Sequence, residues 1–315
     1  MAKLTIAQEK RWMQMPFNQT KKVLLIINPT AGKTRVKSKI LDIADLFRKN
    51  GYAATTLTTA KKGDAADFVK QYASEHDLIV CCGGDGTLNE IISGFMQSAS
   101  QLPIGYIPTG TTNDMAKTLH LPKSIKKAAH MIQNEQPIYQ DIGMFNTTHY
   151  FSYIASFGAF TKVSYATPQW LKNRFGHLAY VLDGIRSVGD IHPYRLKVTA
   201  DNLEDEDEFI FGSVTNSCSV GGMFQFKRED VCLNDGKFEV LLIRNPRNPV
   251  ELRRILYGLI HKKFDKKSIL FFHANQVTFE FEKETAWTVD GEFAGQSHKV
   301  QIENLHNAIK IIRKE

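Results

Sequence analysis

Residues 83–87 read Gly-Gly-Asp-Gly-Thr and lie directly between an apolar run at 78–82 and an apolar, helix-spaced run at 88–98. Glycine weakens regular elements, by about 1 kcal/mol in a helix interior, so this stretch is predicted to be a turn with close backbone approach. A strand end, a glycine turn and a helix start together present backbone N–H groups and the positive end of a helix dipole to an anion. The chemistry predicted for these residues is phosphate binding.

Asp85 is the unexpected member of this turn, because a bare carboxylate repels phosphates. Its presence is explained if a Mg²⁺ ion or a substrate hydroxyl lies between the carboxylate and the phosphates. The alternative is a structural turn in which Asp85 caps its own helix by accepting the N–H of Leu88 or Asn89. The stretch matches neither the Walker A pattern nor GxGxxG.

Two further stretches have the same form. Residues 28–33 (NPTAGK) and residues 107–114 (IPTGTTND) also follow apolar runs, and both contain glycine and hydroxyl or amide donors. Such turns at the ends of parallel strands meet at one crevice, where these folds bind ligands.

Much farther along, residues 288–295 (TVDGEFAG) make Asp290 a candidate general base for an alcohol acceptor. The alternative for Asp290 is an Asp-Gly hairpin turn.

The segments that must position these residues alternate in the first half of the chain. Short apolar runs predict buried strands and longer runs with helical spacing predict helices between them. This alternation predicts a doubly wound α/β layer with parallel strands. The predicted strands are 22–28, 53–59, 77–82 and 102–108, and the predicted helices are 37–50, 64–75 and 88–98.

The second half contains short alternating runs separated by turn signals, the pattern of an antiparallel sandwich or barrel. The predicted strands are 149–160, 194–201, 208–217, 236–244, 276–282, 286–293, 298–304 and 308–314, with helices at 168–189 and 249–262. A shift in composition at 140–146 marks the predicted boundary. We therefore expect an N-terminal extension at 1–20, an α/β nucleotide-binding domain at 21–140 and a β-sandwich lipid-substrate domain at 141–315, leaving open whether the last residues return to the first domain.

Composition narrows the class of partner. The 315 residues carry a formal net charge of +7 and a pI of about 9.1, which favours nucleic acid, an acidic membrane face or a phosphorylated substrate. No apolar run approaches the roughly 20 residues that span a bilayer, and the N-terminus lacks the apolar core of a secretory signal. A cytoplasmic protein is predicted. The four cysteines show no metal-ligand spacing and are predicted to be buried free thiols.

The stretches NPTAGK, GGDGTLNE, IPTGTTND, CLNDGKF and TVDGE occur in an order and at spacings that resemble the soluble bacterial diacylglycerol kinase family, related to sphingosine and ceramide kinases. The resemblance runs from about residue 22 to the end. It implies an N-terminal domain of the NAD kinase and phosphofructokinase type beside a mainly antiparallel β-sandwich. It also implies a kinase that uses ATP and Mg²⁺ to convert diacylglycerol to phosphatidic acid in bacterial phospholipid recycling.

The resemblance also assigns roles to individual residues. Asp290 matches the family's proton acceptor, and Asp85, Asp114 and Glu292 would orient that base or the catalytic Mg²⁺. Contacts with ATP are implied for residues of the predicted turns and one strand end: Asn28, Pro29, Thr30, Ala31, Gly32, Thr59, Gly84, Asp85, Gly86, Thr87, Leu88, Asn89, Glu90 and Thr111.

A second, structural Mg²⁺ site is implied for residues 231–240 (VCLNDGKFEV). Asp235 would supply a carboxylate, and Cys232 and Lys237 would supply backbone carbonyls. Asn234 stands where the family also has acidic residues, which weakens the expected site. The alternative is a plain Asn-Asp-Gly hairpin.

A lipid substrate requires contact with a membrane. Within 249–268 an apolar stripe is flanked by basic residues; it either contacts the membrane or, as we favour, packs on its own domain. Residues 167–188 and the N-terminal extension are further candidates for membrane contact. The expected partners are diacylglycerol or a similar lipid and anionic phospholipid at the inner membrane face, without nucleic acid, and a homodimer is left open. The stripe comprises Leu252, Ile255, Leu256, Leu259 and Ile260.

Two other functions compete with this interpretation. A kinase of the same superfamily would act on another lipid alcohol, a long-chain base or NAD. A non-catalytic nucleotide-sensing or nucleic-acid-binding regulator would account for the pI of about 9.1. Simple ligand binding, however, does not require Asp85 and Asp290 together.

Overall fold

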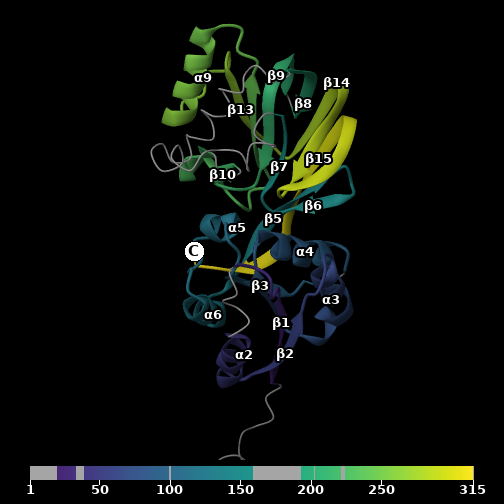
Figure 1. Ribbon diagram of the computed structural model, residues 1–315, viewed down its shortest axis with the longest axis vertical. Coiled ribbons are helices and arrows are strands. Elements are labelled where there is room, and N and C mark those ends of the chain that lie inside the picture. The colour runs from purple at the N-terminus through teal and green to yellow at the C-terminus, as the bar shows by residue number, and fades with distance from the viewer. Residues whose placement is uncertain are drawn as a thin grey trace, which may run out of the picture.

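The computed structural model describes residues 20–32, 39–98, 101–158, 193–201, 203–220 and 224–314. Most of the predicted N-terminal extension, the predicted helix at 168–189 and the candidate membrane segment 167–188 lie outside these residues. The α/β layer and the antiparallel part are stacked along the long axis of the molecule (Figure 1).

The first part is the predicted doubly wound layer. Strands β1 (Lys21–Ile27), β2 (Tyr52–Thr58), β3 (Leu78–Gly83) and β4 (Pro103–Pro108) are parallel and lie in the order β4-β3-β1-β2. Helices α2 (Ile40–Lys49) and α6 (Ile125–Asn134) pack together on one face, and α3 (Asp64–Tyr72) and α4 (Asp85–Met96) on the other (Figure 1). Short elements η2 (Ala73–Glu75) and α5 (Asp114–Thr118) complete it. Residues 23–27 and 78–83 are buried throughout, which explains their continuous apolar runs.

The second part is mainly antiparallel, as predicted. Its strands are β5 (Pro137–Phe145), β6 (His149–Phe151), β7 (Ile154–Gly158), β8 (Tyr194–Ala200), β9 (Leu203–Thr215), β12 (Phe238–Arg244), β13 (Ile269–Ala274), β14 (Gln276–Val289) and β15 (Glu292–Ile312). Both β7 and β8 pair with β9 and with β14, so these four strands enclose a core of aromatic rings around Trp287. The remaining elements are β10 (Ser219–Val220), β11 (Phe224–Gln225), η5 (Arg228–Asp230) and α9 (Pro249–His261).

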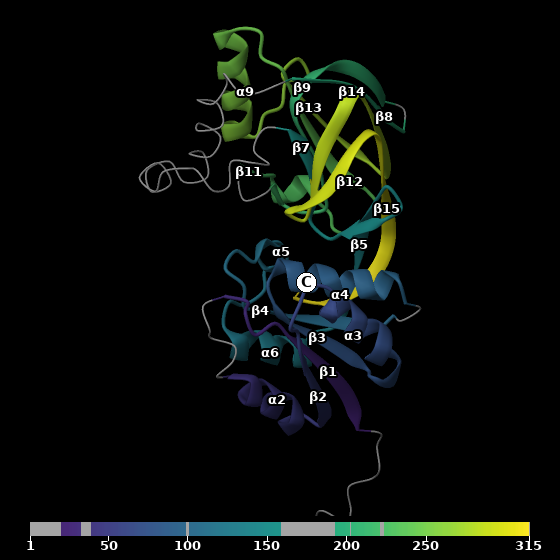
Figure 2. The same cartoon turned by 45° about the vertical axis from the view of Figure 1, so that its right-hand side comes forward.

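Strand β15 joins the two parts into one sheet. It pairs with β14 and β5 and ends parallel to β4, with Lys310 opposite Pro103 and Ile311 opposite Ile104. The end of the chain therefore lies in the first part, an arrangement that the sequence left open. Figure 2 shows β15 running from the antiparallel strands down to the α/β layer.

Several predicted boundaries differ from the observed ones. The expected strands 276–282 and 286–293 are largely one bulged strand, β14, which continues to Val289, and 298–304 and 308–314 belong to β15. Register shifts let these long strands bend around the core without ending. The sequence missed β5 and β13, and β5 covers most of the composition shift at 140–146. Cys81 and Cys82 are buried as expected, but Cys232 is exposed in a loop, contrary to expectation.

Candidate active site

The three glycine-containing turns are bonded to one another at the ends of β1, β3 and β4. Thr109 N–H and Gly110 N–H donate to the Gly83 carbonyl at 2.8 and 3.3 Å. The Asn28 amide Nδ2 donates to Thr87 Oγ1 at 3.0 Å. These bonds hold the turns in one surface at the carboxyl edge of the parallel sheet, as the convergence of strand ends predicts.

Two of the glycines are required by backbone-to-backbone contacts between these turns. A Cβ on Gly110 would lie 2.7 Å from the Gly84 Cα, and a Cβ on Gly32 would lie 2.1 Å from the Thr109 carbonyl oxygen. Gly32 also has a φ of +66°, which L-residues rarely adopt. The turns can therefore approach this closely only because they lack side chains at these positions.

Asp85 does not cap its own helix, so the alternative that the sequence left open is wrong. Its carboxylate accepts N–H bonds from Asp114 at 2.9 Å and Met115 at 3.1 Å, at the start of α5. Burial raises the pKa of Asp85, the two N–H donors oppose this shift, and nearby Asp114 adds to it. Asp85 thus fixes the turn after β4 against the turn after β3.

Asp114 lies below the same surface and is largely buried. It accepts hydrogen bonds from the Tyr153 hydroxyl at 3.4 Å and from the Lys117 ammonium at 2.9 Å. The contact with Tyr153 brings the β6–β7 connection to the α/β layer. Asp85 and Asp114 therefore form a pair of partly buried carboxylates beneath the turns.

Asp290 occupies a two-residue hairpin turn between β14 and β15, with φ values of +48° for Asp290 and +84° for Gly291. These angles suit a type I′ turn, so the predicted hairpin is present. The turn also directs the Asp290 carboxylate at three backbone N–H groups, those of Ser152, Tyr153 and Ile154, at 3.0, 3.1 and 2.9 Å. This explains why the predicted strand 149–160 breaks after Phe151.

The Asp290 carboxyl group has an unusual pKa. Burial raises it to about 6, the three backbone N–H groups oppose the rise, and the charge of Asp85 adds to it. A carboxylate with a pKa near 6 is ionised at neutral pH yet is a stronger base than an ordinary aspartate. The position of Asp290 is therefore chemically suited to proton abstraction.

A first cleft of about 530 Å³ lies between the glycine turns and the β14–β15 hairpin. Of the residues expected to bind nucleotide, ten line it: Asn28, Thr30, Ala31, Gly32, Thr59, Gly84, Gly86, Thr87, Glu90 and Thr111. Glu292 lines it from the antiparallel part. The sequence missed Lys61 and Lys62, although they lie two and three residues after a predicted strand, because basic pairs occur along the whole chain.

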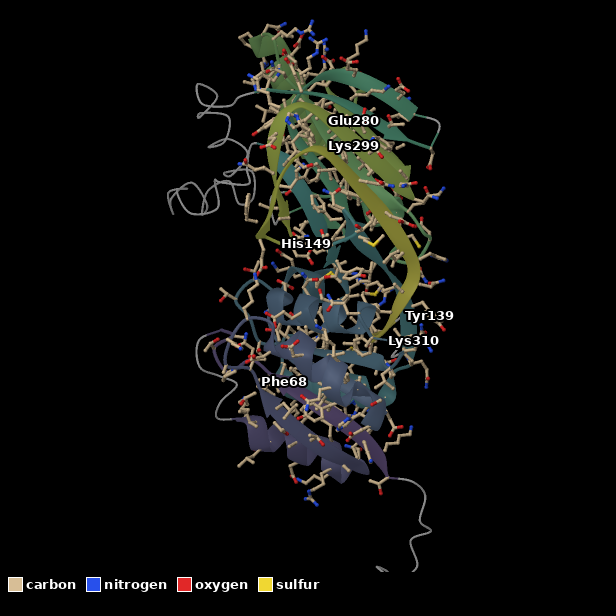
Figure 3. The ribbon with its side chains drawn as sticks, turned by 90° about the vertical axis from the view of Figure 1, so that its right-hand side faces the viewer. Phe68, Tyr139, His149, Glu280, Lys299 and Lys310 are labelled. Carbon is tan, nitrogen blue, oxygen red and sulfur yellow. The ribbon has the colours of Figure 1, made fainter. Side chains whose placement is uncertain are left out.

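A second cleft of about 320 Å³ adjoins the first and shares Lys62, Gly86, Glu90 and Glu292 with it. Asp290 and Asn89 line only this second cleft. Its wall is partly apolar, with Tyr150, Val289, Phe293 and Ala294. Figure 3 shows His149, another lining residue, between the α/β layer and the antiparallel strands. The two clefts thus adjoin at these four shared residues, and Asp290 lies in the second cleft, two residues before the shared Glu292.

The remaining predicted residues do not line the first cleft. Leu88 is fully buried in the core, and its N–H donates to the Gly84 carbonyl within α4. Pro29 lies in the first turn without lining either cleft, and Asp85 and Asp114 lie beneath the surface. Leu88 carries an apolar side chain on the buried side of α4, which its helical spacing indicates.

The loop expected to hold a structural metal connects to a buried carboxylate that the sequence missed. Asp141 on β5 is fully buried and accepts the N–H of Gly236 at 2.7 Å and of Asn307 at 2.7 Å, and it contacts the His306 ring nitrogen Nδ1 at 3.0 Å. It therefore ties this loop to β15. Its sequence context, QDIGMFN, contains no pattern that marks such a role.

Within that loop, Asp235 accepts the N–H of Lys237 at 3.0 Å, as in a hairpin turn, and Cys232 Sγ contacts Asn234. Glu239 follows, and burial raises the pKa of its carboxyl to about 9, with the charge of Asp235 adding to the rise. One of its oxygens is buried without a hydrogen-bond partner. The described part of the chain contains no group of three or more His, Cys, Asp or Glu that could hold a metal.

Helices long and apolar enough to cross a bilayer are absent from the part of the chain that the structure describes.

Comparison with known proteins gives a consistent result. The family model of the diacylglycerol kinase catalytic domain matches residues 22–145. The diacylglycerol kinase of Bacillus subtilis (strain 168) is 32% identical over 294 residues, covering 93% of this chain and 96% of the relative. The diacylglycerol kinase of Staphylococcus haemolyticus (strain JCSC1435) is 30% identical over 274 residues, covering 86% and 82%.

A solved structure agrees with these relatives. The crystal structure of a candidate diacylglycerol kinase from Bacillus anthracis str. Sterne superposes with a TM-score of 0.78 at 27% identity, covering 96% of this chain and 98% of that one. The resemblance seen in the motifs is thereby confirmed over nearly the whole length. This chain belongs to the diacylglycerol kinase catalytic domain family.

Proposed function

We propose that this protein is an ATP- and Mg²⁺-dependent lipid kinase that phosphorylates the free hydroxyl of diacylglycerol to give phosphatidic acid. The observation that carries the proposal is the pair of adjoining clefts, of which the second contains Asp290. One cleft is lined by glycine turns with free space for phosphates, and the other by a candidate base and apolar side chains. This is the arrangement that transfer from a nucleotide to a lipid alcohol requires.

The first cleft is assigned to ATP. The backbone at Gly84, Gly86 and Gly110 allows close approach, and the N-terminus of α4 points its positive dipole end at this cleft. Lys61 and Lys62 add positive charge near the phosphates. Lys62 also pairs with Glu292 at 2.5 Å, which connects the two sides of the cleft. Because both side chains are exposed, this pair contributes little to folding stability.

The second cleft is assigned to the glycerol end of the lipid. Asp290 takes the proton of the acceptor hydroxyl as that oxygen attacks the γ-phosphorus. The bond from phosphorus to the β–γ bridging oxygen breaks, and ADP leaves. The N–H groups of Ser152, Tyr153 and Ile154 hold the carboxylate in place for this step. Exposed Phe293 at the rim gives the acyl chains an apolar contact.

The chain's own carboxylates fit Mg²⁺. Asp85 and Asp114 are hard oxygen donors, partly buried under the phosphate-binding turns. Burial raises the pKa of Asp85, and the charge of Asp114 adds to the rise. Mg²⁺ usually binds through one or two carboxylates together with substrate phosphates rather than in an all-protein cage. When bound there, it would neutralise charge on the transferring phosphoryl group.

A second Mg²⁺ ion is proposed at residues 231–237. The carboxylate of Asp235 and the backbone carbonyls of Cys232 and Lys237 are oxygen donors. Glu239, two residues after Lys237, has a buried carboxyl oxygen without a hydrogen-bond partner, and a bound cation would supply that partner. We also propose that the protein works in the cytoplasm and binds reversibly to the inner face of the membrane, where diacylglycerol resides.

Labelled ATP tests the proposal directly. The purified protein is incubated with γ-labelled ATP and Mg²⁺ together with, in separate reactions, diacylglycerol, a long-chain base, another lipid alcohol and NAD. We expect label in phosphatidic acid and a preference for diacylglycerol. Label only in aqueous products would favour NAD, and absence of transfer to every acceptor with ATP still bound would favour the non-catalytic regulator.

The assignment of the second cleft has its own test. Phe293→Ser removes exposed apolar area at the rim, and we expect KM for diacylglycerol to rise while KM for ATP stays unchanged. Leu41→Ser, at an even more exposed position on α2, is the control. A rise in KM for ATP alone would contradict the assignment of the two clefts.

A further inference from the structure

Helix α9 has two different faces. Ile255 and Leu259 are buried against the antiparallel part, with Leu252 and Leu256 partly buried beside them, so most of the predicted stripe packs on its own domain as favoured. Ile260 is the exception and is 48% exposed. With Val250, at 66%, and Tyr257, at 55%, it forms an exposed apolar face that the sequence analysis did not identify. These residues recur at helical spacing and therefore lie along one side.

The local sequence explains where this face begins and ends. Asn248 caps the helix by accepting N–H bonds from Val250 and Glu251, with Pro249 at the first helical position. The helix ends at Lys262, which has a φ of +54°. Basic residues then follow immediately, so the exposed face is bordered by a basic segment.

The charge of the chain is concentrated here. Residues 247–268 contain seven basic and two acidic residues, a formal net charge of +5 out of +7 for the whole chain. Arg254 lies 3.9 Å from Asp265, and Lys262 donates to the Phe226 carbonyl. Arg253, Lys263, Lys266 and Lys267 are exposed and make no ion pair with the residues that the structure describes. These four cations are therefore available to an anionic partner.

A groove lies beside the exposed face. Its volume is about 230 Å³, and Arg254, Tyr257, Lys263 and Phe264 are among the residues that line it. The groove combines two cationic and two aromatic side chains with one carboxylate, that of Asp265, and Tyr257 has the apolar ring and polar tip typical of membrane–water interfaces. A phosphate-bearing headgroup matches this chemistry.

We propose that the exposed face of α9, with the basic residues 253–267 around it, docks on a membrane surface containing anionic phospholipid. This inference rests on the proposed function, because it names the surface by which the kinase reaches its lipid. Val250, Tyr257 and Ile260 reach the boundary of the acyl chains, while the cations remain at the phosphates. Nucleic acid would match the cations but not the three apolar side chains.

The docking face is separate from the chemistry. Helix α9 lies on the antiparallel part, away from the α/β layer (Figures 1 and 2), and none of its residues lines either cleft. Changes on this face are therefore expected to alter membrane binding without altering phosphoryl transfer. This separation makes the proposal testable independently of activity.

The main test uses a variant with Arg253, Lys263, Lys266 and Lys267 all changed to Gln. Cosedimentation is measured with vesicles of phosphatidylcholine alone and with added phosphatidylglycerol. Each basic residue near an anionic surface contributes about 1 kcal/mol, or about fivefold, to binding, so loss of four lowers the partition coefficient by about six-hundredfold. The double variant Lys126→Gln/Lys127→Gln, with exposed lysines on α6, is the charge control and is expected to bind like wild type.

Further measurements complete the test. Changing Val250, Tyr257 and Ile260 to Ser should weaken vesicle binding, with Leu41→Ser as the control. Wild-type binding should fall as salt increases, a result that does not depend on any variant folding. Equal binding by the four-Gln variant, equal binding to vesicles without anionic lipid, or tighter binding of nucleic acid than of vesicles would each overturn the proposal.

Activity separates this inference from the proposed function. The four-Gln variant should lose turnover of diacylglycerol embedded in vesicles but keep turnover of a water-soluble short-chain diacylglycerol. If wild type phosphorylates neither substrate, the proposed function fails, whereas vesicle binding still decides whether α9 docks. Equal loss on both substrates in the four-Gln variant would place the cations in the chemistry and overturn the docking role.

Discussion

Replacement of Asp290 by Asn tests the roles of this residue in catalysis and in the hairpin turn together. Asn keeps the size of the side chain and tolerates the positive φ of the turn, but it cannot accept a proton from an alcohol. We expect turnover to fall by roughly a hundred- to ten-thousandfold, the usual contribution of a general base. ATP should still bind, because Asp290 does not line the first cleft.

The stability effect of the same variant can be worked out from the pKa. Burial raises the pKa of Asp290 from 3.8 to about 6. At 1.36 kcal/mol for each pH unit, the folded protein disfavours the ionised carboxylate by roughly 3 kcal/mol relative to the unfolded chain. The proton is therefore held more tightly in the folded state than in the unfolded one.

The sign of the pH dependence follows from this difference. The favourable contribution of Asp290 to folding is fully present below pH 3.8 and is lost as the pH rises through about 6. Wild type should therefore gain roughly 3 kcal/mol of unfolding free energy relative to Asp290→Asn as the pH falls from 7.5 to below 4. In wild type, kcat/KM should fall tenfold for each pH unit below about 6, because the base must be ionised.

The assays are denaturant unfolding across this pH range and transfer of labelled phosphate to diacylglycerol at pH 7.5. Asp201→Asn is the matched control, since Asp201 is an exposed turn residue with a φ of +44° between β8 and β9. It should leave both measurements unchanged. Wild-type turnover in Asp290→Asn would refute the assignment of the base, and a stability difference that does not vary with pH would refute the raised pKa.

Four other substitutions test the surroundings of the site. Gly110→Ala should destabilise the fold by about 1–3 kcal/mol, because its Cβ would lie 2.7 Å from the Gly84 Cα. In Gly86→Ala the added Cβ meets nothing within 4 Å, so the melting temperature should stay unchanged or rise while ATP binding weakens. Equal destabilisation by both variants would contradict the packing argument. Asp85→Ala removes the acceptor of two N–H groups at α5 and should cost about 1–2 kcal/mol in chemical denaturation along with activity, whereas a purely catalytic role would leave stability unchanged. Asp141→Ala removes a fully buried carboxylate that joins three segments and should cost about 3–5 kcal/mol of unfolding free energy, so a change below 1 kcal/mol would show that those bonds are replaced by water.

Local sequence patterns predicted much of the fold. Apolar runs predicted β1, β3 and β4, and a threonine-rich run predicted β2. The glycine turns after β1, β3 and β4 predicted a binding edge, because these features depend on neighbouring residues. The same patterns missed β13 and split β14 into two strands. A bulge that bends a long strand around a core looks like a strand end when only the sequence is considered.

The sequence likewise predicted one part of the candidate site, and only the tertiary structure showed the other. Sequence alone identified ten of the nucleotide-binding candidates that line the first cleft, together with the Asp-Gly hairpin that carries Asp290, since turn chemistry is local. Only the tertiary structure showed that Asp85 binds the start of α5, 29 residues away, and that Asp290 takes N–H groups 136 to 138 residues away. It also decided that Asp141 joins three segments and that α9 turns three apolar side chains outward. These partners are set by how whole strands and helices pack, and no periodicity along the chain encodes which distant N–H group a buried carboxylate will meet.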